Sequence, residues 1–129
     1  MRIRAPLIEI NDEATITSQV EWRDTGHDRG FAIRINTLVD GTMVEVLKYD
    51  PFEINSHFHE YCRDTGRELI RPMPSGHIGI DWALRDLPVR LYGFVEPHLF
   101  SKESTESLLD GIEAAIIEIS PLYLTGRVD

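Results

Sequence analysis

Two histidines separated by one residue, His57 and His59, are the side chains of this sequence whose spacing is best suited to chemistry. They belong to the run HFHEYC, which is typical of a short strand, and side chains at alternate positions of a strand point to the same face. Two imidazole rings on one face can share a metal ion. They can also act as a general acid and a general base, because imidazole has a reference pKa of about 6.5.

The metal hypothesis needs further ligands, because Zn²⁺ takes three or four N, S or O ligands and a catalytic site keeps one position open. The nearby candidates are His77 and one acid, either Asp50 or Asp64. With His57 and His59 they would supply three nitrogens and one oxygen. Imidazole suits Zn²⁺, Ni²⁺ or Fe²⁺ better than Mg²⁺, so the cofactor expected for such a site is zinc or another transition metal. The sequence indicates no other cofactor.

The catalytic hypothesis makes His57 and His59 the acid and base of a phosphodiesterase, with Arg63 or Arg67 holding the phosphate through its guanidinium group. A third interpretation gives the two histidines no chemistry. In it they are exposed or hydrogen-bonded side chains on either side of a buried Phe58. The first two interpretations place the functional part of the chain between residues 50 and 77.

Composition limits the class of protein. The chain has 129 residues, 13 Lys+Arg against 22 Asp+Glu, and a net charge of −9, which fits one domain spanning residues 1–129. An acidic chain is a poor ligand for phosphate backbones and anionic membranes, so we expect a protein partner, or a second copy of the chain, rather than nucleic acid. There is no stretch of about 20 apolar residues, no apolar signal-peptide core and a single cysteine, Cys62, which together predict a cytoplasmic protein without membrane association.

The first half of the chain alternates between apolar and polar residues, which predicts strands over 14–22, 31–39 and 42–49. Asp40-Gly41 predicts a two-residue hairpin in which Ile35 faces Val46 and Thr37 faces Val44. Residues 57–62 and 67–73 are expected to form a second pair of strands.

The sequence of the second half of the chain predicts mainly helix. Residues 81–87 indicate a short helical turn stopped by Pro88, and 89–95 favour a strand. A C-terminal helix is predicted over 104–119, capped by Ser101 or Ser104 and ended by Pro121. Its apolar face holds Leu108, Ile112, Ala115, Ile116 and Ile119. The predicted fold class is α+β, an antiparallel β-meander sheet with the C-terminal amphipathic helix packed on one face.

Two families resemble parts of this chain. His57-x-His59 followed by Asp64 is similar to the first cupin motif, and residues 74–77, PSGH, are similar to the second. A cupin would continue as a double-sheet jelly roll, whereas this chain turns helical. The order of a strand ending in Tyr49-Asp50, a histidine segment and a C-terminal helix resembles small bacterial proteins that include the TumE-like toxins of toxin–antitoxin systems. This second resemblance is one of layout, and it implies a conflict or defence setting.

Two functions from different classes follow. The one that we favour from the sequence is a small cytoplasmic binding or regulatory protein that engages a protein partner, because the charge is strongly acidic and the catalytic set is incomplete. The alternative is a histidine-based enzyme centred on His57 and His59. It would be either a phosphodiesterase or RNase-like toxin, or a metal-dependent hydrolase.

Overall fold

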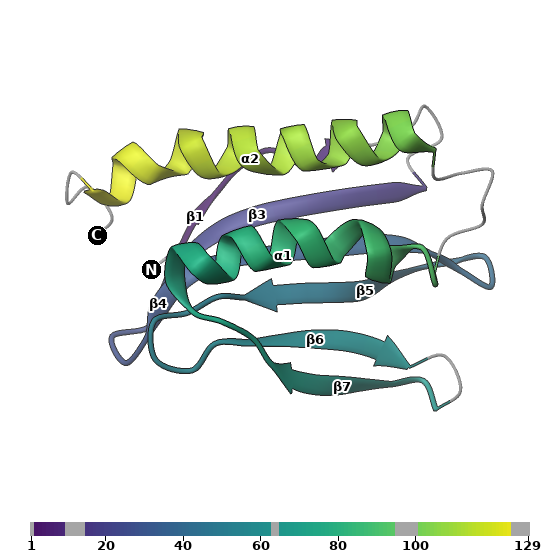
Figure 1. Cartoon of the computed structure of the whole chain (residues 1–129), viewed down its shortest axis with the longest axis horizontal. Coiled ribbons are helices and arrows are strands. Elements are labelled where there is room, and N and C mark those ends of the chain that lie inside the picture. The colour runs from purple at the N-terminus through teal and green to yellow at the C-terminus, as the bar shows by residue number, and fades with distance from the viewer. Residues whose placement is uncertain (1, 10–14, 63–64, 95–100, 125–129) are drawn as a thin grey trace.

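The computed structural model describes residues 2–9, 15–62, 65–94 and 101–124. The described strands form one antiparallel sheet in the order β1-β3-β4-β5-β6-β7, with the short β2 also paired to β3 (Figure 1). The strands are β1 (Arg2–Arg4), β2 (Ile8–Glu9), β3 (Ile16–Asp24), β4 (Arg29–Val39), β5 (Thr42–Asp50), β6 (His57–Cys62) and β7 (Arg67–Pro72). The helices are α1 (Gly76–Leu91) and α2 (Lys102–Leu124). The predicted α+β class is confirmed.

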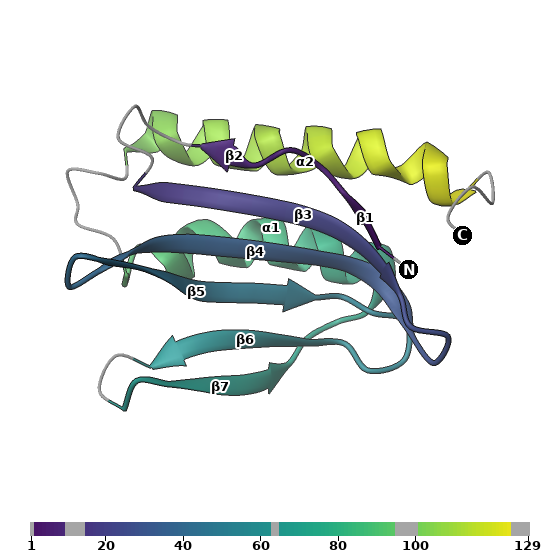
Figure 2. The same ribbon diagram turned by 180° about the vertical axis from the view of Figure 1, so that it is seen from behind.

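Both helices lie on the same face of the sheet, with α2 along β3 and α1 along β5 (Figures 1 and 2). The core lies between the two layers. The predicted apolar face of α2 is confirmed, because Leu108, Ile112, Ala115 and Ile119 are buried and Ile116 is partly buried. Each fully buried Leu or Ile contributes about 1.5–3 kcal/mol relative to an exposed one, so this face holds α2 on the sheet.

No described helix covers the opposite face of the sheet (Figure 2). Strand pairing places polar and charged residues on that face. Side chains alternate along a strand, so the neighbours of core residues point to this uncovered face. Arg34, Lys48 and His59 lie in one row across β4, β5 and β6, because Arg34 pairs with Lys48 and Lys48 with His59. We call this surface the open face. It is not part of the double-sheet jelly roll that the cupin motifs imply.

The β4–β5 hairpin turns at Asp40 and Gly41, whose φ angles of 51° and 80° suit the predicted two-residue turn. Thr37 pairs with Val44 as predicted. The predicted pairing of Ile35 with Val46 is wrong, because a β-bulge shifts the register and Ile35 pairs with Leu47 instead. Because the bulge adds one residue to β5, the side chains that follow it point to the opposite face of the sheet from the one predicted.

The helix boundaries differ from the prediction in three places. The predicted turn over 81–87 and the first residues of the predicted strand over 89–95 belong to one helix, α1, which continues through Pro88. Gly79, Ala83, Leu87 and Leu91 are buried at four-residue spacing, so packing on the sheet outweighs the hydrogen bond that a proline removes. Residues 92–94 form a turn, and residue 95 lies outside the described residues.

In α2, the Ser101 hydroxyl accepts the backbone N–H of Ser104 at 3.1 Å, so Ser101 is the N-cap and the helix begins at Lys102, earlier than predicted. The helix also passes through Pro121 and ends at Leu124, so the prediction that Pro121 stops it is wrong. None of the described helices is long and apolar enough to span a membrane.

Candidate metal centre

Asp50, His57 and His59 meet on the open face because of strand pairing. Asp50 ends β5 and pairs with His57 at the start of β6, while Lys48 pairs with His59. The β-bulge is essential to this arrangement. Without its extra residue, Asp50 would face the helices and not the two histidines.

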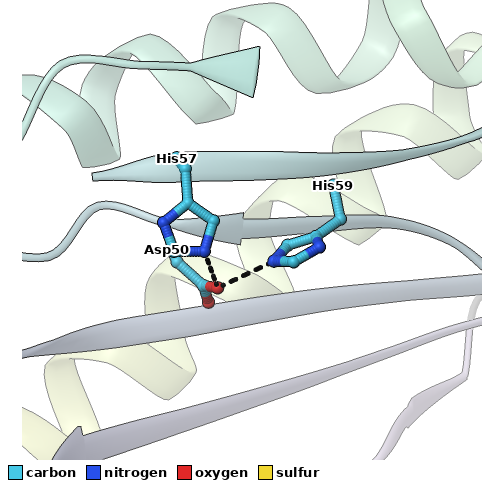
Figure 3. Close-up of side chains that lie close together, drawn as sticks. All are labelled: Asp50, His57 and His59. Carbon is cyan, nitrogen blue, oxygen red and sulfur yellow. Dashed lines mark ion pairs between the residues drawn. The ribbon is translucent and has the colours of Figure 1, made fainter. Parts of the chain in front are cut away.

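The two rings point at the same carboxylate oxygen (Figure 3). Asp50 Oδ2 lies 3.1 Å from His57 Nε2 and 3.4 Å from His59 Nε2, and the three ligand atoms all lie within 4.8 Å of one another. Ligand atoms at zinc-bond lengths of about 2.0–2.1 Å in a tetrahedron are about 3.3–3.4 Å apart. The two distances from Asp50 Oδ2 are close to this value and suit a shared transition-metal ion.

The other nitrogen of each ring, Nδ1, points away from Asp50 and faces an oxygen that can only accept a hydrogen bond. His57 Nδ1 lies 2.8 Å from the backbone oxygen of Asn55, and His59 Nδ1 lies 3.2 Å from Glu68 Oε2. When each Nδ1 donates to that partner, a neutral ring carries its lone pair on Nε2. Both lone pairs then face Asp50. Metal-ligating histidines are oriented in this way, with the second nitrogen donating to a carbonyl or carboxylate.

Asp50 is the most buried member of the cluster, with 1% of the residue exposed. Lys48 Nζ lies 3.4 Å from Asp50 Oδ2, but Asp50 Oδ1 is buried and has no hydrogen-bond partner among the described residues. A buried acceptor without a partner costs about 1–3 kcal/mol. Two neutral rings with their Nε2 lone pairs toward this carboxylate would also be repelled by it unless a proton on each ring or a metal ion lay between. The cluster is therefore arranged to receive positive charge.

The loop between β5 and β6 is fixed by Asp28. Its carboxylate accepts the backbone N–H groups of Ile54 at 3.0 Å and Asn55 at 2.8 Å, and that of Arg29 at 2.9 Å. Burial acts to raise the pKa of Asp28, but these backbone hydrogen bonds lower it below its ordinary value. Because Asn55 also supplies the carbonyl that accepts from His57, Asp28 orients that ring indirectly.

A buried aromatic ring supports the same loop. Phe52 is 8% exposed and its ring meets that of His57 edge to face, with centroids 6.2 Å apart. Its place depends on Gly30 of β4, where an added Cβ would lie 2.8 Å from the Phe52 ring. The sequence therefore needs glycine at position 30 for the loop to approach the sheet this closely.

Beneath the site, Tyr49 points the opposite way and donates to Asp86 of α1 at 2.7 Å. Arg90 of α1 bonds to Asp86 through two nitrogens, at 2.7 and 3.0 Å, and to Glu60 of β6 at 2.8 Å. Burial, together with the hydrogen bond to Asp86, raises the pKa of Tyr49 far above its ordinary value, so its hydroxyl remains a neutral donor. This network ties β5 and β6, the two strands of the site, to α1.

A second charged group lies on the open face beside the site. Glu21 is buried and bonds to Arg4 at 3.2 Å and Arg34 at 3.0 Å, and Arg34 also bonds to Glu45 at 2.9 Å. Burial acts to raise the pKa of Glu21, but the hydrogen bond and charge of Arg34, with the charge of Arg4, lower it overall. These four residues neutralise one another.

The other predicted site residues are not in the cluster. His77 is exposed in the first turn of α1 and lines a separate small cavity of about 140 Å³ with Trp22 and Phe31. Arg67 is exposed at the start of β7, opposite Cys62 and away from the two rings. Arg63 and Asp64 lie outside the described residues. Of the predicted ligands, the described structure brings together Asp50, His57 and His59.

Three residues that shape the site were not predicted to be part of it, namely Lys48, Glu68 and Asp28. Lys48 had a signal, since it stands two residues before Asp50 in a predicted strand. Glu68 and Asp28 reach the histidines through strand pairing and a loop contact, neither of which can be predicted from local sequence.

Comparison with protein-family models, with curated proteins and with solved structures finds no match to this chain. The resemblance to TumE-like toxins stays a prediction. The geometry of the site is therefore the basis for inferring a function.

Proposed function

We propose that the protein binds one divalent transition-metal ion, with Zn²⁺ as the first candidate, through Asp50 Oδ2, His57 Nε2 and His59 Nε2. The observation that carries the proposal is the convergence of His57 Nε2 and His59 Nε2 on Asp50 Oδ2, at 3.1 and 3.4 Å, while an acceptor faces each Nδ1. Without a metal ion, each contact needs a second proton on the ring.

The proposed activity is metal-dependent hydrolysis. Two histidines and one carboxylate leave at least one coordination position for water or substrate, as in catalytic zinc sites. The side chains of His57 and His59 are 21% and 17% exposed, so the site is partly accessible to solvent from the open face. Zinc held by three protein ligands lowers the pKa of a bound water to about 7, which supplies a nucleophile near neutral pH.

Two rings directed at one oxygen are less suited to acid–base catalysis without a metal. An acid and a base must reach two different atoms of a substrate, whereas both Nε2 atoms here point to Asp50 Oδ2. The expectation of a protein partner stays a prediction, supported by the net charge of −9. The cytoplasmic setting also stays a prediction.

Isothermal titration calorimetry tests the metal proposal. Protein stripped with a chelator and titrated with Zn²⁺ at pH 7.5 should bind one equivalent. His57→Ala, His59→Ala and Asp50→Asn should each weaken binding at least a hundredfold. His77→Ala is the matched control, because that exposed histidine lies outside the cluster, and it should bind as the wild type does. Wild-type protein that takes up no Zn²⁺, or an equal loss in His77→Ala, would refute the proposal.

A further inference from the structure

Within the part of the chain that the structure describes, Lys48 is a basic side chain in direct contact with a proposed ligand. It lies on β5 opposite His59, and its Nζ is 3.4 Å from Asp50 Oδ2. Its side chain is only 13% exposed, so the ammonium group lies against the site rather than in bulk water. A buried lysine needs a negative partner, and here that partner is the carboxylate that would bind the metal.

Metal binding changes the balance of charge at this point. Before it, Lys48 and Asp50 neutralise each other, while Glu68 faces His59. A divalent ion adds two positive charges, so +2 and +1 stand against −1 from Asp50 and −1 from Glu68, which leaves +1. Arg34, the next residue in the row, does not alter this sum, because Arg4 and Arg34 are matched by Glu21 and Glu45.

We propose that the open coordination position takes a phosphate group, bound through one oxygen to the metal and through another to Lys48 Nζ. This inference rests on the proposed metal site. A phosphate group has one oxygen for the metal and another for the Lys48 ammonium group, and its negative charge balances the excess positive charge. It also gives Lys48 a new anionic partner when the Asp50 carboxylate binds the metal. The substrate class expected for the hydrolase is therefore a phosphate ester, with Lys48 as the residue that selects it.

Cobalt provides the test, because the visible absorption of protein-bound Co²⁺ reports its ligands. Inorganic phosphate added to the Co²⁺ protein should shift the absorption and bind at least tenfold more tightly than acetate. Lys48→Met should bind Co²⁺ at least as well as the wild type and should bind phosphate at least tenfold more weakly. Lys48→Arg, which keeps the charge, should recover part of the phosphate affinity. Lys102→Met is the control, because Lys102 is exposed at the start of α2.

The outcomes separate the two proposals. Wild-type protein that binds no Co²⁺ contradicts the metal site itself and with it the phosphate site. Protein that binds Co²⁺ but shows no response to phosphate, or prefers acetate, overturns only the phosphate inference. So does a Lys48→Met protein that binds phosphate as the wild type does, because Lys48 would then serve only to pair with Asp50.

Discussion

Replacing Asp28 with Asn tests how the loop that orients His57 is held. The Asp28 carboxylate accepts three backbone N–H groups, from Arg29, Ile54 and Asn55, at 2.8 to 3.0 Å. Asparagine keeps one oxygen, but its NH₂ group faces at least one N–H donor. Hydrogen bonds to a charged group contribute about 1.5–3 kcal/mol each, and Asp28 is partly exposed, so we expect Asp28→Asn to lower the free energy of unfolding by about 1–2 kcal/mol.

The loss should depend on pH in a defined direction. The folded-state pKa of Asp28 is lowered, so its contribution is fully present above the ordinary aspartate pKa of about 3.9 and is lost as pH falls through the folded value. Urea denaturation of both proteins from pH 7 to pH 3 measures this. The difference in unfolding free energy should be constant near neutral pH and should shrink in the acid range.

Asp81→Asn is the matched control, because Asp81 is an exposed acid on α1, and it should change stability by less than about 0.5 kcal/mol. Equal stability of wild type and Asp28→Asn at pH 7 would refute the reasoning. So would a difference as large at pH 3 as at pH 7, since it could not come from the charge.

Three further predictions concern the core, the outer contacts of the site and its pH range. Ile112→Asp should destabilise the protein by several kcal/mol in urea denaturation, whereas Ile117→Asp on the exposed side of α2 should change it little; similar effects would contradict the packing of α2. Glu68→Ala should weaken Zn²⁺ binding about tenfold in calorimetry. Removing a group that hydrogen-bonds a metal-ligating histidine lowers metal affinity about 10–100-fold, and Glu68 is half exposed; unchanged affinity would show that Glu68 does not support the site. Zn²⁺ affinity of the wild type should fall steeply below about pH 6 as protons compete for the ring nitrogens, and a flat profile from pH 8 to 5 would exclude histidine ligands.

The sheet could largely be predicted from sequence, because its signals are local. Alternation over 31–39 and 42–49 and the Asp-Gly turn fix the central hairpin without any knowledge of the rest of the chain. Helix α1 was misjudged for a physical reason. Pro88 and a run of β-branched and aromatic residues carry local preferences against helix, and burial of one face against β5 overrides them.

The candidate site was predicted in part. The spacing of His57 and His59 is enough to place both rings on one face, and Asp50 was among the acids considered. The choice of Asp50, however, depends on the bulge in the β4–β5 pairing, which sets its facing and has no clear mark in the sequence. The partners of the outer ring nitrogens, Asn55 and Glu68, depend on the loop and on the register of β7.

Anomalous diffraction at the zinc absorption edge, from crystals of the wild-type protein grown with one equivalent of Zn²⁺ at pH 7.5, tests the central claim most directly. The account predicts one strong peak on the open face, about 2.0–2.2 Å from Asp50 Oδ2, His57 Nε2 and His59 Nε2. Well-ordered rings of His57 and His59 with no peak between them, or a peak at His77 instead, would contradict it.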